Sequence, residues 1–153
     1  MTTLTYRIDI DRPLAFVYDM ACRVERHPEF IPDYLHCRIL QRDGDWMLIE
    51  RSALIRGKPV IWNSWLTCRP NEGLSFVHHG GRLDGMSVDW HFEPVAAHRT
   101  RMTITQRFRI RTPIPGLGVL LEQWLFAPKL GDIARRVIRH FKEACESTVE
   151  ARQ

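Results

Sequence analysis

The sequence predicts an α+β fold in which a curved antiparallel sheet of seven strands wraps a long C-terminal helix. Three observations lead to this fold: an apolar/polar alternation of period two near the N-terminus, several short segments of the same kind joined by tight turns, and a helical period after residue 116. With 153 residues and a hydrophobic content of 44%, the chain can build a sizeable core within one domain spanning residues 1–153.

The N-terminal elements are a strand followed by short helices. Residues 4–10 alternate apolar and polar side chains, which is typical of a strand with one buried face. Asp11 and Pro13 then supply helix-start signals, and the apolar residues of segment 14–21 recur at helical spacing, so we expect a helix of about three turns. The prolines at 28 and 32 exclude a longer helix there, and we expect a loop with one short helical turn before Tyr34.

From Tyr34 onward the chain predicts six strands. Segments 42–45, 56–59, 70–73 and 83–85 hold the Gly, Pro and Asx residues that hairpin turns require. Connections this short force antiparallel neighbours, because a parallel pair needs a crossover of about a dozen residues or more.

The C-terminal third predicts one long amphipathic helix, which Pro128 should kink or split. It is the only element large enough to cover the apolar face of the sheet, and the space left between them is a plausible ligand site. One stripe of this helix is apolar: Leu117, Leu120, Leu121, Trp124, Leu130, Ile133, Ala134, Val137, Phe141 and Cys145.

Several strand residues are candidates for the wall of that space. Segment 60–69 has one row that mixes aromatic and polar groups (Ile61, Asn63, Trp65, Thr67 and Arg69) and another that contains Val60, Trp62, Ser64, Leu66 and Cys68. From the residues alone, Arg69 fits a cavity contact or the exposed end of a strand. Trp90 lies in an apolar row, where it can form the floor of a cavity or part of the core. Gln106 is the polar member of another row, where it can contact a ligand or hydrogen-bond a backbone group.

Other function classes find little support. The four cysteines are scattered, His78 and His79 fall on opposite faces of one strand, and no nucleotide-binding or hydrolase motif occurs, so we predict no metal site and no cofactor. The N-terminus shows neither a secretory signal nor a membrane span, so a cytoplasmic protein is expected. The net charge of +4 and the basic run within 135–142 fit a solvated helix face better than a nucleic-acid partner.

The sequence resembles the START-like helix-grip superfamily (SRPBCC), specifically its polyketide cyclase and coenzyme Q-binding branch. The resemblance covers nearly the whole chain and rests on segments 12–18, 24–32 and 90–92, of which Pro-Glu-Phe-Ile-Pro at 28–32 is the most characteristic. It implies a helix-grip fold and a hydrophobic ligand: a polyketide, a quinone or a lipid.

Aromatic polyketide aromatase/cyclases are similar in more detail. Trp65, Thr67 and Arg69 fall where they carry a Trp, a Ser and an Arg that point into the cavity. Tyr34 falls on their cavity tyrosine and Arg82 near a second arginine, whereas His27 replaces a tryptophan. The resemblance implies aldol closure of a poly-β-keto chain with loss of water, in which Arg69 stabilises the oxyanion and Tyr34 and Thr67 transfer protons. The candidate ligand contacts are Trp65 and Arg82, from this resemblance, and Trp90, Asn63, Gln106, Phe30 and Trp124, which belong to the strand rows, the 28–32 segment and the helix stripe named above.

A non-catalytic carrier of a lipid or a ubiquinone-type molecule remains the alternative, since it needs only an apolar cavity with an exit. The cyclase interpretation adds an acyl carrier protein as an expected partner. His27 and the loop 113–116 are expected to flank the mouth of the cavity.

Overall fold

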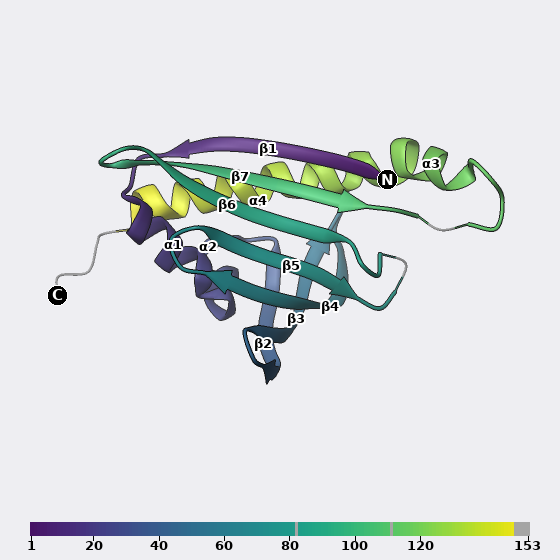
Figure 1. Ribbon diagram of the computed structural model, residues 1–153, viewed down its shortest axis with the longest axis horizontal. Coiled ribbons are helices and arrows are strands. Elements are labelled where there is room, and N and C mark those ends of the chain that lie inside the picture. The colour runs from purple at the N-terminus through teal and green to yellow at the C-terminus, as the bar shows by residue number, and fades with distance from the viewer. Residues whose placement is uncertain (82, 111, 149–153) are drawn as a thin grey trace.

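The computed structural model of the protein describes residues 1–81, 83–110 and 112–148 (Figure 1). The elements follow one another in the predicted order, with helices between the first and second strands and at the C-terminal end. They are β1 (Thr2–Ile10), α1 (Leu14–Cys22), a 3₁₀ turn (Val24–Arg26), α2 (His27–Phe30), β2 (Tyr34–Asp43), β3 (Trp46–Ile55), β4 (Lys58–Arg69), β5 (Gly73–His79), β6 (Ser87–Ala96), β7 (Arg99–Phe108), α3 (Leu117–Leu121), a π-helical segment (Glu122–Phe126) and α4 (Ala127–Ser147).

The seven strands form one antiparallel sheet in the order β1-β7-β6-β5-β4-β3-β2. Each strand from β2 to β6 pairs with the next one in the sequence, as the short turns predict, and β1 pairs with β7. The predicted seven-stranded antiparallel sheet is therefore confirmed.

The sheet is strongly curved. The register of β2 on β3 shifts twice, between Tyr34 and His36 and between Ile39 and Gln41, and such bulges bend and twist a strand. Figure 1 shows the result: β2 and β3 run across the direction of β6 and β7, and the sheet folds over α4, while α1 and α2 lie at one end. The concave face of the sheet and α4 together enclose the core.

The C-terminal helical segment is continuous from Leu117 to Ser147 but changes from α to π geometry just before Pro128. The π-helical segment ends at Phe126, and α4 begins one residue before Pro128, whose missing N–H is tolerated in a first turn. From there the predicted apolar stripe packs against the sheet, and its most deeply buried members are Ala134, Val137, Phe141 and Cys145.

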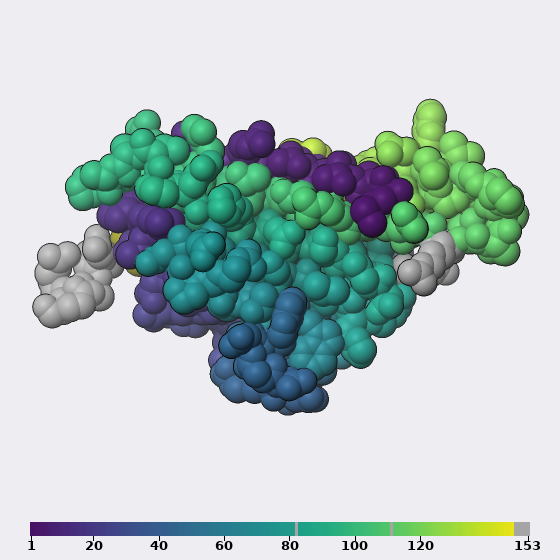
Figure 2. Space-filling view, in the orientation of Figure 1, coloured from purple at the N-terminus to yellow at the C-terminus, as the bar shows by residue number. Residues whose placement is uncertain are grey.

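The upstream part of that stripe does not pack as predicted. Leu120 and Trp124 expose 55% and 81% of their surface. For Leu120, Figures 1 and 2 show the physical reason, because α3 projects past the ends of the strands. Trp124 lies in the π-helical segment, whose Glu122 and Gln123 hydrogen-bond Thr2 of β1, and its own side chain is on the exposed side of that segment. Among the described residues, no helix combines the length and the apolarity that crossing a bilayer requires.

Candidate functional site

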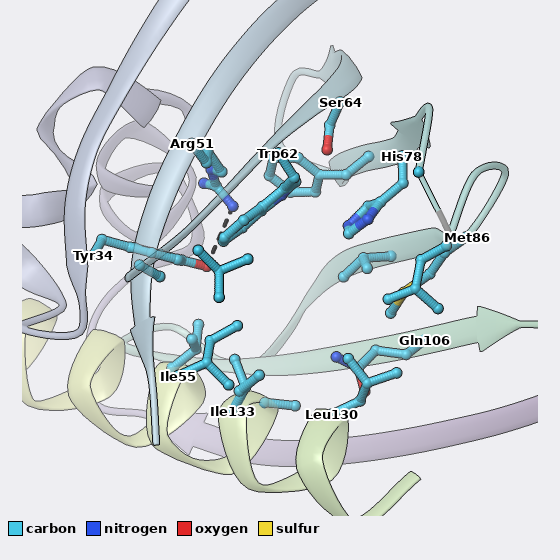
Figure 3. A pocket seen from close by; sticks show the side chains of 18 of the residues that line it. Tyr34, Arg51, Ile55, Trp62, Ser64, His78, Met86, Gln106, Leu130 and Ile133 are labelled. Atoms are coloured by element: carbon cyan, nitrogen blue, oxygen red, sulfur yellow. Dashed lines mark hydrogen bonds between the residues drawn. The ribbon is translucent and has the colours of Figure 1, made fainter. Parts of the chain in front are cut away.

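A cavity of about 300 Å³ lies between the concave face of the sheet and α4 (Figure 3). Its rim includes Ile61, which is 59% exposed, and the glycines Gly80 and Gly81. Most of its lining is apolar, and both the sheet side and α4 contribute to it. The apolar lining residues include Trp62, Phe76, Met86, Val88, Trp90, Ile104, Leu130, Ile133, Ala134 and Val137. The space therefore suits an apolar ligand.

Five polar side chains interrupt this lining, each from a different strand. They are Tyr34 from β2, Arg51 from β3, Ser64 from β4, His78 from β5 and Gln106 from β7. Strand alternation explains why they share a face, because the register pairs Ser64 with His78 and sets Arg51 opposite Trp62, another residue of the lining. Figure 3 shows them around one space, with a hydrogen bond between Arg51 and Tyr34.

Arg51 is the most unusual of the five. Only 5% of its surface is exposed, and its guanidinium lies 4.7 Å from the ring centroid of Tyr34 and 4.5 Å from that of Phe76. Its Nη1 donates a hydrogen bond to the Tyr34 hydroxyl at 3.3 Å, and its Nη2 contacts Nδ1 of His27 at 2.6 Å. The positive charge of Arg51 is thus contacted only by neutral hydrogen-bond acceptors and aromatic faces among the groups described around it.

The charge of Arg51 has no counter-charge in the part of the chain that the structure describes. No carboxylate there forms an ion pair with it, and its Nε has no hydrogen-bond partner. An uncompensated buried charge costs several kcal/mol. A positive group kept at that cost beside a cavity can stabilise negative charge on a ligand.

Two histidines near Arg51 are neutral. Burial, with the nearby Arg51 charge, lowers the pKa of His27 to about 3 and that of His78 to about 4. His78 lines the cavity and stacks on Trp62 at 6.1 Å between ring centroids. His27 is completely buried and stacks on Trp90 at 5.4 Å. Neither ring adds positive charge to the site at neutral pH.

Two further polar atoms of the lining have no protein partner among the described residues: Oγ of Ser64 and Oε1 of Gln106. Buried polar atoms are nearly always hydrogen-bonded. The cavity can therefore offer them to a ligand or to water.

Three of the sequence-predicted site residues line the cavity: Tyr34, Trp90 and Gln106. Four others lie on the opposite, outward row of β4, namely Asn63, Trp65, Thr67 and Arg69. Thr67 donates to the backbone oxygen of Asp45 at 2.8 Å, and Arg69 donates to Ser75 Oγ at 2.8 Å.

The predicted convergence of Tyr34, Thr67 and Arg69 is therefore corrected. Trp65 packs edge-on against His79, which also points outward. The inward row holds Trp62, Ser64 and Leu66, so it keeps a Trp and a Ser two residues apart and places a leucine where the arginine was expected. Strand β3 supplies a cavity arginine instead.

The remaining predicted residues that the structure describes do not line the cavity. Phe30, on α2, lies beside His27 at 6.4 Å between ring centroids, and Trp124, in the π-helical segment, is 81% exposed. Arg82 lies outside the described residues. His27 is buried and not at a mouth, and none of residues 113–116 is part of the lining.

Arg51, Ser64 and His78 are the polar cavity residues that sequence reasoning missed. A signal for Arg51 exists, because it interrupts an otherwise apolar row of β3: Met47, Ile49, Ala53 and Ile55. This is the same kind of signal that pointed to Gln106.

A concave antiparallel sheet that closes on a C-terminal helix around an apolar cavity, with a few inward polar groups, defines a helix-grip protein of the START-like type. Comparison with known proteins then places the chain. The model of the family described as "Polyketide cyclase / dehydrase and lipid transport" matches residues 10–145, and the chain belongs to this family.

Two Streptomyces relatives carry similar sequences. A Streptomyces cyaneus protein, named provisionally as a polyketide cyclase, is 26% identical over 113 residues, which cover 71% of this chain and 73% of that protein. The granaticin polyketide synthase bifunctional cyclase/dehydratase of Streptomyces violaceoruber is 27% identical over 135 residues, which cover 84% of this chain but only 42% of that protein.

Solved structures show the same fold. The crystal structure of the Zhui aromatase/cyclase from Streptomyces sp. R1128 matches with a TM-score of 0.82 over 98% of this chain and 96% of that chain. Its sequence identity is 14%, so this likeness concerns the fold.

Proposed function

We propose that this protein binds a poly-β-keto chain in its cavity and catalyses aldol ring closure followed by loss of water. The observation that carries the proposal is the uncompensated guanidinium of Arg51 on an apolar cavity wall, 3.3 Å from the hydroxyl of Tyr34. The family and the names of the curated relatives support the same reaction class. In this proposal an acyl carrier protein delivers the substrate as a thioester.

Ring closure needs a carbon nucleophile and a stabilised oxygen anion. A methylene carbon between two carbonyls passes a proton to water to give an enolate, and that carbon forms a bond to a distant carbonyl carbon of the same chain. The carbonyl oxygen becomes an alkoxide, which Arg51 stabilises and Tyr34 protonates. The hydroxyl then takes up a proton and departs as water while the neighbouring ring carbon gives a proton to solvent, which leaves the double bond, and Tyr34 regains its proton from solvent.

The cavity walls contribute by restricting the substrate to one folded conformation. A flexible chain rarely brings the correct two carbons together, and holding them at reaction distance removes much of the entropic barrier. The flat faces of Trp62, Phe76 and Trp90 suit the planar ring that results.

The test is turnover of a synthetic poly-β-keto thioester, with products followed by liquid chromatography and mass spectrometry. Arg51→Met should lower the yield of ring-closed product by about 10²–10³-fold, the usual loss when an oxyanion donor is removed. Arg69→Met is the matched control on the outer face and should leave the yield unchanged. If Arg69→Met abolishes closure and Arg51→Met does not, the assignment of Arg51 is wrong.

A carrier of a lipid or a quinone is the second candidate. It is favoured by the predominantly apolar lining and by the lipid-transport part of the family description. Extraction of the purified protein with organic solvent, followed by mass spectrometry, separates the two: a quinone or a lipid supports carriage, and an aromatic polyketide supports cyclisation.

A further inference from the structure

We propose that His27 is a neutral anchor that positions Arg51 and leaves its positive charge unpaired, so that the cavity binds the ionised form of an acidic, flat ligand. Such a ligand is an enolate, a phenolate or a carboxylate attached to an apolar ring system. The inference concerns the cavity of the proposed function and rests on that proposal for its biological setting, but its test requires no turnover.

The geometry of His27 fixes which ring nitrogen carries the hydrogen. Nε2 lies 2.7 Å from the backbone oxygen of Ala21, and a carbonyl oxygen can only accept a hydrogen bond, so Nε2 is the donor. Nδ1 therefore presents its lone pair to Nη2 of Arg51 at 2.6 Å. Both nitrogens are used, and the ring of His27 lies nearly parallel to Tyr34 and Trp90, at interplanar angles of 16° and 3°.

A carboxylate is the usual partner of a buried arginine, and at this position it would cancel the charge. The imidazole instead holds the guanidinium by a hydrogen bond and contributes no charge. Cys37, which is paired with Arg51 across the strands, does not supply a negative charge either, because burial raises the pKa of its thiol. The groups described around Arg51 thus position the cation without neutralising it.

The unpaired charge defines one end of the ligand, and the rest of the lining defines its body. An anionic oxygen fits beside Arg51, a flat apolar body fits between Trp62 and Trp90, and a hydroxyl donor on the ligand can reach the unpartnered Oε1 of Gln106. An acidic phenol or enol with a second hydroxyl combines these features.

The first test uses the unmodified protein and 6-cyano-2-naphthol, a flat phenol whose ionisation is followed by absorbance. Bound to the cavity, its apparent pKa should fall by about one to two pH units, as an opposite charge within contact distance produces. This corresponds to a tenfold to hundredfold tighter complex of the naphtholate than of the naphthol. An unchanged titration, or the absence of binding by either form, overturns the inference.

The second test compares His27→Asn with His27→Asp. The two side chains have the same size and place an oxygen near the position of Nδ1, so the loss of packing and of the Ala21 hydrogen bond is the same in both. The Asn variant should keep the lowered pKa of the bound naphthol, and the Asp variant should remove it because its carboxylate neutralises Arg51. Equal lowering in the two variants overturns the role of His27.

If either variant fails to fold, the ring-nitrogen chemical shifts of His27 in the wild-type protein test the same role. They should show an unprotonated Nδ1 and a protonated Nε2 for His27 between pH 6 and 8, and the opposite tautomer or an imidazolium overturns the anchor. The outcomes separate this inference from the proposed function. A lowered naphthol pKa without any ring closure refutes the cyclase proposal and supports the anion site. Ring closure with an unchanged naphthol titration supports the cyclase proposal and refutes the anion site.

Discussion

Replacing Arg51 with methionine should separate stability from ligand binding. The change removes two cation–π contacts, together about 3 kcal/mol in a desolvated site, and leaves Nδ1 of His27 without a donor at about 2 kcal/mol. It also removes an uncompensated buried charge, and this relief stabilises the folded protein by about 3–5 kcal/mol. The free energy of unfolding should therefore change by less than about 2 kcal/mol in either direction.

Truncation of the completely buried Phe141 gives a reference value, because Phe141→Ala should cost about 3–5 kcal/mol of stability through the cavity it creates. Both variants can be measured by urea unfolding with tryptophan fluorescence as the probe.

The same Arg51→Met protein should lose affinity for an anion selectively. Its complex with 2-naphthoate should weaken by about 2–3 kcal/mol, roughly 30- to 150-fold, whereas binding of the neutral 2-naphthamide should change little. Calorimetric titration at pH 7 measures both. A loss of more than about 4 kcal/mol in stability, together with equal weakening of the two ligands, would show that Arg51 serves the fold and would refute the reasoning.

Two further predictions concern Tyr34 and the neutral histidines. Tyr34→Phe should lower ring closure by about 10²–10⁴-fold, as loss of a positioned proton donor does, while 2-naphthoate affinity changes less than about threefold; unchanged turnover contradicts the role of the hydroxyl. Since burial lowers the pKa of His27 to about 3 and of His78 to about 4, both take up a proton on unfolding below the ordinary value of 6.5, so stability is present above that pH and is lost as the pH falls. Urea unfolding should give about 4 kcal/mol less stability at pH 5 than at pH 8, and His27→Asn should remove about half of the difference; equal stability at the two pH values would show that the histidines are not buried in neutral form.

The sequence predicts the strands and the long helix because the signals for them are local. Alternation and turn residues within each segment are enough to define the antiparallel order. The face of β4 is different, since each of its two rows contains one tryptophan, Trp62 or Trp65, among aliphatic and polar residues. Period two then shows that rows exist but not which one is inside, and a shift to the other row exchanges every side chain between cavity and surface.

The missed arginine and the exposed lobe have a common cause. An arginine within a strand is usually exposed, and what keeps Arg51 inside is an acceptor on α2, 24 residues away in the sequence. In the same way, the apolar period of residues 117–124 is correct, but Leu120 is exposed because α3 projects past the ends of the strands, and Trp124 is exposed although its neighbour Gln123 hydrogen-bonds Thr2 of β1. Both outcomes depend on which elements meet in space, which no local pattern contains.

The contrast between Arg69 and Arg51 gives a physical criterion for choosing between candidate arginines. Arg69 contacts Ser75, whose hydroxyl donates to Asp89 at 2.6 Å, and Arg107 reaches the same carboxylate at 3.1 Å. This outer row is a partly exposed network in which the carboxylate of Asp89 already compensates the nearby positive charge. Such networks contribute little to binding an anion, because the ligand would have to displace the carboxylate.

Arg51 is held only by neutral groups, so an anionic ligand gains the full interaction and displaces nothing charged. The distinction does not depend on how deeply either arginine is buried but on what neutralises it. Where the alternation of a strand does not show which row faces inward, we therefore expect the functional arginine to be the one whose neighbours in the fold lack a carboxylate.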